Sequence, residues 1–152
     1  MNWQALFLSG QGRIGRRDFW IGFAGVMVAS LVLQFIPVIG QLVGLVLLWP
    51  QVNINTKRLH DMGKSGWWLL APLGVTILCA IAAVIFGGAA IFASGGGDGH
   101  RLAGGLTAFG IALVFLGVAG LTGLGFLLWI GVTPGQPLDN RFGSPPVAAA
   151  LT

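Results

Sequence analysis

Long uncharged apolar stretches alternate along the chain with short segments that carry the charges. Charged residues are absent between Phe19 and Thr56, between Gly66 and Gly97, and between Leu102 and Leu138. A single helix over the first stretch would be about 57 Å long, nearly twice the ~30 Å hydrocarbon thickness of a bilayer. This stretch is therefore predicted to fold back on itself, with the break at Pro37 and Gly40.

The second and third stretches are each too short for two spans and long enough for one tilted span. The pattern therefore predicts an all-α integral membrane protein with four transmembrane helices arranged as two hairpins. We place the spans at residues 19–36, 38–56, 67–93 and 104–131. They form a single membrane domain of residues 1–146, which a short tail of residues 147–152 follows.

The basic residues predict the orientation. Seven of the eight Lys and Arg residues lie before the first span, between the second and third, or after the fourth. Because positive charge near span ends tends to stay on the cytoplasmic side, both termini are predicted to be cytoplasmic. The six Trp residues, which favour the headgroup level, follow the same side. The seven basic residues are Arg13, Arg16, Arg17, Lys57, Arg58, Lys64 and Arg141.

Composition favours a multi-pass membrane protein. Of the 152 residues, 55% are hydrophobic and 8% are charged, whereas about a quarter of a soluble domain is charged. The net charge of +4 does not indicate nucleic-acid binding, because the basic residues lie at span ends rather than in one dense patch. Cys79 is the only cysteine, so no intrachain disulfide and no cysteine-based metal site is expected. We expect no cofactor.

The second span is unusual because its apolar part is short. A helix from Val38 to Pro50 would be only about 20 Å long, so polar residues beyond it must enter the membrane zone. These residues are Gln51, Asn53 and Asn55. Polar side chains at that depth need protein partners or a wet cavity, which suggests a small transporter or channel as an alternative function. Against it, no Asp, Glu, Lys, Arg or His lies inside any predicted span.

The connection after the second span is predicted to be a helix end, a turn and a helix start. Gly63 suits the left-handed position after a helix, and Ser65 suits the N-cap of the next one. Asp61 follows Arg58 by three residues and Lys57 by four, so it can pair with either. His60 and Asp61 are adjacent and face different directions on a helix, which makes an interfacial enzyme acting on lipid headgroups the least favoured function.

The basic side of the membrane is the candidate binding face. The hypothesis we favour is a non-enzymatic protein whose cytoplasmic face binds anionic lipid headgroups or a protein partner, including a second copy of the chain. A specific phosphate or carboxylate site built with Arg16 or Arg17 is a sharper version of it, because Arg offers a planar bidentate donor. The candidate residues are Arg13, Arg16, Arg17, Gln51, Asn53, Asn55, Lys57, Arg58, His60, Asp61, Lys64, Asn140 and Arg141.

Glycines recur at helical spacing, in Gly40-x-x-x-Gly44 and in the series Gly117, Gly120 and Gly123. Small residues at such positions let helix backbones approach closely in membranes. We therefore predict helix packing at these positions rather than a pore or a hinge.

Three separated motifs resemble the bacterial inner-membrane family called domain of unknown function 805. They are Gly12-Arg13 with Arg16-Arg17-Asp18-Phe19-Trp20, then Arg58-Leu59-His60-Asp61-Met62-Gly63-Lys64-Ser65-Gly66-Trp67-Trp68, then Pro134-Gly135 with Asn140-Arg141-Phe142-Gly143. The resemblance implies a small helical inner-membrane protein and a structured C-terminal segment, which composition alone would have suggested to be disordered. It implies no reaction and no catalytic residue.

Overall fold

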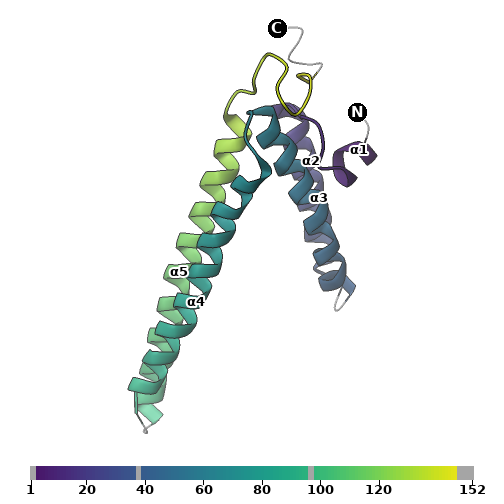
Figure 1. Cartoon of the computed structure of the whole chain (residues 1–152). Helices are drawn as coiled ribbons and strands as arrows, with labels where there is room; N and C mark the ends of the chain where they lie inside the picture. Colours follow the sequence, from purple (N-terminus) through teal and green to yellow (C-terminus); the bar gives the residue numbers. More distant parts are fainter. Residues whose placement is uncertain (1–2, 37–38, 96–97, 147–152) are drawn as a thin grey trace. The chain divides into compact units, whose positions relative to one another are not determined.

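The computed structural model describes residues 3–36, 39–95 and 98–146, and most of these residues lie in helices. Strands are absent from this part of the chain, which confirms the all-α prediction. The helices are α1 (Trp3–Leu8), α2 (Arg16–Leu33), α3 (Ile39–Asp61), α4 (Leu70–Ala93) and α5 (Asp98–Val132), and a 3-10 turn η1 (Gly66–Leu69) precedes α4. Figure 1 shows their order along the chain.

The chain divides into two compact units. Unit 1 comprises Met1–Leu69 with Leu128–Thr152, and unit 2 comprises Leu70–Leu127. Unit 1 therefore holds α1, α2, α3, η1 and the last turn of α5, whereas unit 2 holds α4 and most of α5.

Unit 1 is built around the α2–α3 hairpin, against which α1 packs (Figure 1). Phe19, Ile54 and Leu59 are fully buried in it. Gly22 of α2 permits the close approach, because a Cβ there would lie 3.2 Å from Ile54 Cδ1 and 3.3 Å from Leu6 Cδ2. Burial of these apolar side chains is the main stabilisation of the hairpin end where the motifs lie.

The predicted turn after α3 is confirmed. Gly63 has a φ of +71°. The amide of Lys64 donates to the Leu59 carbonyl at 2.8 Å and that of Gly63 to His60 at 2.9 Å, which is a Schellman motif. Ser65 caps the next helix as predicted, since its Oγ accepts the Trp67 amide at 3.4 Å, but that helix begins as the 3-10 turn η1 and not as α4 itself.

The helices correspond to the four predicted apolar segments, but they do not all begin and end at the predicted residues. α3 continues through Pro50 to Asp61, so it ends five residues after the predicted second span. α5 begins at Asp98, six residues before the predicted fourth span. Two segments, Gly66–Ala93 and Gly99–Val132, are long and apolar enough to cross a membrane, with mean hydropathies of 2.6 and 2.4.

Unit 2 is an antiparallel pair made by α4 and α5. Gly87 lies against Ala108, because a Cβ added at Gly87 would lie 3.7 Å from the Cβ of Ala108. The rings of Phe86 and Phe115 stack with their centroids 6.2 Å apart. The predicted glycine packing is wrong for most positions, because a Cβ would meet no atom within 4 Å at Gly44, Gly117, Gly120 and Gly123. A Cβ added at Gly40 would instead come very close to the backbone of Leu33.

Candidate functional site

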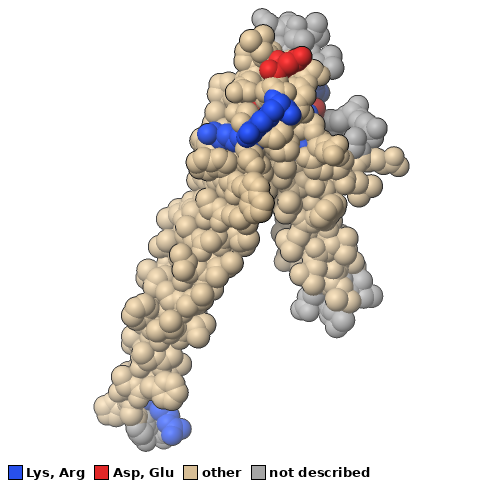
Figure 2. Space-filling view, viewed as in Figure 1, with Lys and Arg blue, Asp and Glu red and all other residues tan. Residues whose placement is uncertain are grey.

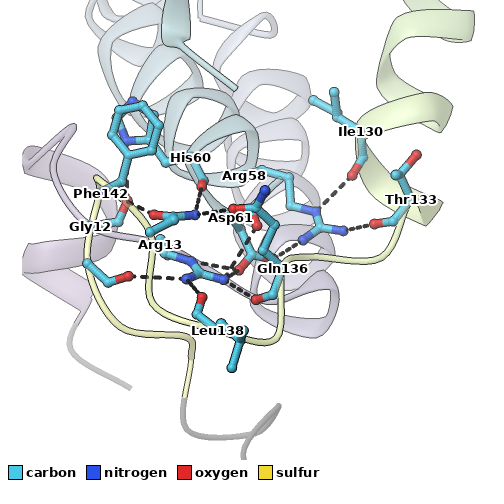
Figure 3. Close-up of polar contacts among 12 residues, drawn as sticks. Gly12, Arg13, Arg58, His60, Asp61, Ile130, Thr133, Gln136, Leu138 and Phe142 are labelled. Atoms are coloured by element: carbon cyan, nitrogen blue, oxygen red, sulfur yellow. Dashed lines mark hydrogen bonds and ion pairs between the residues drawn. The ribbon is translucent and has the colours of Figure 1, made fainter. Parts of the chain in front are cut away.

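The three motifs meet at a buried cluster of ionic groups, the Arg13–Asp61–Arg58 cluster (Figure 3). Asp61 Oδ1 accepts hydrogen bonds from Arg13 Nη2 at 3.0 Å and from Arg13 Nε at 3.2 Å. Its Oδ2 accepts a hydrogen bond from Arg58 Nη1. Both arginine side chains are 0% exposed and that of Asp61 is 4% exposed. Each buried charge is therefore paired, as burial requires.

Arg58 links the end of α3 to the end of α5. Its Nε donates to the Ile130 carbonyl at 2.8 Å, and its Nη2 donates to the Thr133 carbonyl. Carbonyls at a helix C-terminus lack intrahelical partners and carry partial negative charge, so a guanidinium satisfies them well. Burial lowers the pKa of Arg58, while the charge of Asp61 raises it and the charge of Arg16 lowers it. The guanidinium stays protonated because the pKa of arginine starts far above neutral pH.

The C-terminal strap, residues 133–146, is folded against this cluster. Arg13 donates to the carbonyls of Leu138 at 2.8 Å, Gly143 at 3.1 Å and Gln136. The amide of Gln136 donates to the Asp61 carbonyl at 2.8 Å. The strap is thus ordered as far as the structure describes it, which confirms the expectation drawn from the family resemblance.

Two glycines make the strap fit. A Cβ at Gly135 would lie 2.0 Å from Asp61 Oδ2, and one at Gly63 would lie 2.5 Å from Gln136 Nε2. Gly63 also has the positive φ of the Schellman turn. The close contact between the strap and α3 therefore depends on glycine, which has no side chain, at both positions.

His60 is a structural contact of the strap. Its ring stacks on Phe142 with centroids 3.8 Å apart, and its Nδ1 lies 3.3 Å from the Gly12 carbonyl (Figure 3). Asn140 Nδ2 donates to the His60 carbonyl at 3.0 Å. Burial lowers the pKa of His60, the hydrogen bond to Gly12 raises it, and Arg141 lowers it. His60 and Asp61 thus have different partners, as predicted, and do not form a dyad.

Lys64, the lysine of the middle motif, contacts two tryptophan rings. Lys64 Nζ lies 4.9 Å from the ring centroid of Trp68 and 5.5 Å from that of Trp129. These cation–π contacts hold the start of η1 against the end of α5. Lys57 is 4% exposed, and burial lowers its pKa.

The polar residues of α3 do not share one cavity. Asn53 is buried, and its Nδ2 donates to the Phe7 carbonyl at 2.8 Å. Gln51 instead lines a mainly apolar groove of about 250 Å³ between α2 and α3, together with Phe23. Asn55 Oδ1 is buried and has no hydrogen-bond partner among the described residues. The reason is helical geometry: two residues along a helix rotate the side chain by about 200°, so Asn53 points away from Gln51 and Asn55.

A pocket of about 460 Å³, the arginine pocket, lies beside the ionic cluster. The first turn of α2 supplies Arg16, Arg17 and Asp18, and the last turn of α3 supplies Arg58 and Asp61. The strap forms the rest of the wall with residues 134–137 and Pro146. The structure thus brings together the arginines predicted to form an anion site.

Arg141 lies outside the arginine pocket. It is exposed, and its guanidinium carbon lies 4.7 Å from the ring centroid of Phe142. Sequence reasoning missed the strap residues that form the wall, although the Pro134-Gly135 motif was a signal for them. On the visible face, Lys and Arg side chains gather where the ends of α2 and α3 meet the strap (Figure 2).

A family model described as "Protein of unknown function (DUF805)" matches residues 7–144 of the chain. The chain belongs to the DUF805 family. A DUF805 match over this range includes all three motifs, which confirms the resemblance drawn from them. The arrangement also explains why the motifs occur together, because Asp61 from the second contacts both Arg13 from the first and Gly135 from the third.

Relatives of this DUF805 chain are likewise named without an activity. It is similar to the "Uncharacterized protein YiiR" of Escherichia coli strain K12, with 36% identity over 88 residues. The same protein of Escherichia coli O157:H7 matches equally well. The alignments cover 53% of this chain and 60% of these relatives, so the chain spans less than two thirds of their length. No solved structure matches the chain.

Metal chemistry has no ready-made ligand set in the described part of this DUF805 chain. Residues 3–36, 39–95 and 98–146 contain no group of three or more His, Cys, Asp or Glu side chains that could hold a metal ion. What the site offers is a set of guanidinium donors beside a pocket. Such a set binds anions.

Proposed function

We propose that this chain is a non-enzymatic, multi-pass protein of the bacterial inner membrane whose basic cytoplasmic face binds anionic lipid headgroups. The arginine pocket is the observation that carries the proposal. Arg16, Arg17 and Arg58 line it, and Asp18 and Asp61 oppose them, so the charged lining residues leave a net charge of one positive. Basic groups at the membrane surface attract anionic lipids by about 1 kcal/mol each.

Four spans with both termini in the cytoplasm would place the pocket at the headgroup level. The pocket includes the first turn of α2, and Trp20 follows in the next turn. Trp68 and Trp129 lie with Lys64 near the start of α4 and the end of α5. Trp and basic residues are both typical of the cytoplasmic membrane boundary.

The topology predicts the side on which each connection lies. Reporters fused after Pro146 and within the α3–η1 connection should be active in the cytoplasm. Reporters in the α2–α3 turn and after Gly95 should be active outside it. A periplasmic signal from either of the first two positions would contradict the four-span proposal.

Lipid retention tests the binding function. Protein purified in a mild detergent should retain several-fold more phosphatidylglycerol or cardiolipin than phosphatidylethanolamine, relative to the membrane it came from. Replacing Arg16, Arg17 and Arg141 together by Gln should abolish this preference, because three surface charges contribute about 3 kcal/mol. Lipids are measured by mass spectrometry of the extracted protein.

Arg101→Gln is the matched control for lipid retention. Arg101 is the one basic residue on the opposite predicted side, so its neutralisation should leave the preference unchanged. Equal retention of anionic and zwitterionic lipid by the unaltered protein would remove the proposed function. So would a loss in Arg101→Gln as large as that in the triple variant.

A further inference from the structure

We infer that the arginine pocket is a specific site for one phosphate ester, either the headgroup of an anionic phospholipid or a soluble phosphate ester. The inference rests on the proposed binding of anionic headgroups and assigns it to one site with one ligand class. It differs from general attraction by a basic surface, because the pocket has a defined volume, available donors and fixed walls.

The volume suits a small polar ligand. About 460 Å³ falls within the range of roughly 300–1,000 Å³ that is typical of small-molecule sites. A phosphoglycerol group is small enough to enter such a pocket. The acyl chains of a lipid would remain outside it.

The donors available to a ligand come from α2. Arg17 makes no hydrogen bond to other residues in the described part of the chain, and Arg16 makes only a long one, from Nη1 to the Val132 carbonyl at 3.5 Å. Each guanidinium has five N–H donors in a planar fork, so both arginines keep most of their donors for a ligand.

The backbone at the start of α2 adds to these donors. Gly15 is the N-cap residue, and no side chain caps the helix there. The first N–H groups of a helix lack intrahelical partners and favour anions. Gly15, Arg16 and Arg17 all line the pocket, so the start of α2 forms one of its walls. A phosphate monoester has three terminal oxygens and can use more of these donors than a carboxylate can, whereas the phosphodiester of a lipid has two terminal oxygens.

The rest of the pocket is fixed before a ligand arrives. Arg58 donates to Asp61, Ile130 and Thr133, so it supplies shape and field but few spare donors to the pocket. Arg13 holds residues 134–137, which form another part of the wall, through the Gln136 carbonyl. A wall held in place lowers the ordering cost of binding.

Asp18 narrows the class of ligand that the arginine pocket can bind. Its carboxylate also lines the pocket, so a bare anion gains less than it would from the arginines alone. A phosphate ester with a hydroxyl group beside the phosphate can donate to that carboxylate. The preferred class is therefore a hydroxylated phosphate ester, of which glycerol phosphate is the simplest.

Binding to the full chain in a neutral detergent tests the inference. The probes are glycerol 3-phosphate and inorganic phosphate, followed by calorimetry, and a short-chain phosphatidylglycerol, followed by native mass spectrometry. We expect saturable binding of one molecule per chain. Arg16→Gln with Arg17→Gln should weaken it at least tenfold, because charge-assisted hydrogen bonds are roughly twice as strong as neutral ones. Both side chains are exposed, so the variant should elute as the unaltered protein does in size-exclusion chromatography.

Arg141→Gln is the control, since it removes one positive charge from the same face and none from the pocket, whereas the double variant removes two from the pocket. It should change the affinity less than twofold. Equal losses in the two variants would overturn the specific site and leave the general binding of anionic lipid intact.

Glycerol 3-phosphate and the short-chain phosphatidylglycerol also separate the sources of the phosphate. Competition by glycerol 3-phosphate against the lipid supports a soluble ester that shares the site, and lipid binding without competition supports the headgroup alone. Saturable binding of neither probe overturns the site. The proposed function is then judged separately, by whether purified protein still retains anionic lipid in preference to zwitterionic lipid.

Discussion

Asp61→Asn should destabilise the protein more than any other single charge-neutralising substitution in the chain. Its carboxylate pairs with both Arg13 and Arg58, whose side chains are fully buried. Neutralising it leaves two buried positive charges without their counter-ion, and loss of one partner from a buried pair costs about 3–5 kcal/mol. Thermal unfolding of purified protein in detergent, followed by intrinsic tryptophan fluorescence, measures the effect.

Asp139→Asn makes the same chemical change at an exposed position of the strap. Surface substitutions of this kind usually change stability by less than about 0.5 kcal/mol. A fall in the unfolding temperature for Asp61→Asn that is no larger than that for Asp139→Asn would contradict the role of the ionic cluster. The unfolding temperature of Asp61→Glu is expected to lie between those of Asp61→Asn and Asp139→Asn, because Glu keeps the charge but does not fit the same space.

Local sequence rules predicted much of the site. The helix end at Gly63 followed from the need for a residue that adopts a positive φ. The three- and four-residue spacings allowed Asp61 to pair with Arg58 or with Lys57, and the structure shows the pair with Arg58. The helical hairpin followed from the length of the uncharged stretch and the break near Pro37, which itself lies outside the described residues. Each of these features depends on residues close together in sequence.

Long-range contacts could not be derived in this way. Arg13 and Asp61 are 48 residues apart. Nothing in the pattern of charges predicts that Arg13 would lie in the buried ionic cluster rather than at the surface. The strap lies still further away, and its folding depends on backbone carbonyls, which every sequence has. The polar residues of α3 show the opposite error, because they were grouped by proximity although Asn53 is rotated away from its neighbours.

Gly135→Ala should loosen the strap although it adds only one methyl group. The new Cβ would lie 2.0 Å from Asp61 Oδ2 and 2.5 Å from its Cγ. That carboxylate is held by two arginines and cannot move aside, so the strap must shift instead. Overpacking of this kind costs about 1–3 kcal/mol, and we expect a lower unfolding temperature.

The same shift should damage the arginine pocket, because residues 134–137 form one of its walls. Gly135→Ala is therefore expected to lower both the unfolding temperature and the affinity for glycerol 3-phosphate. Gly25→Ala is the control: Gly25 lies inside α2, and a Cβ there would meet no atom within 4 Å. Alanine is favoured over glycine inside a helix by about 0.5–1 kcal/mol, so Gly25→Ala should leave the protein as stable or more so. Two variants with the same added methyl group thus have opposite expected signs, and equal unfolding temperatures would show that the strap does not rest on Asp61 as described.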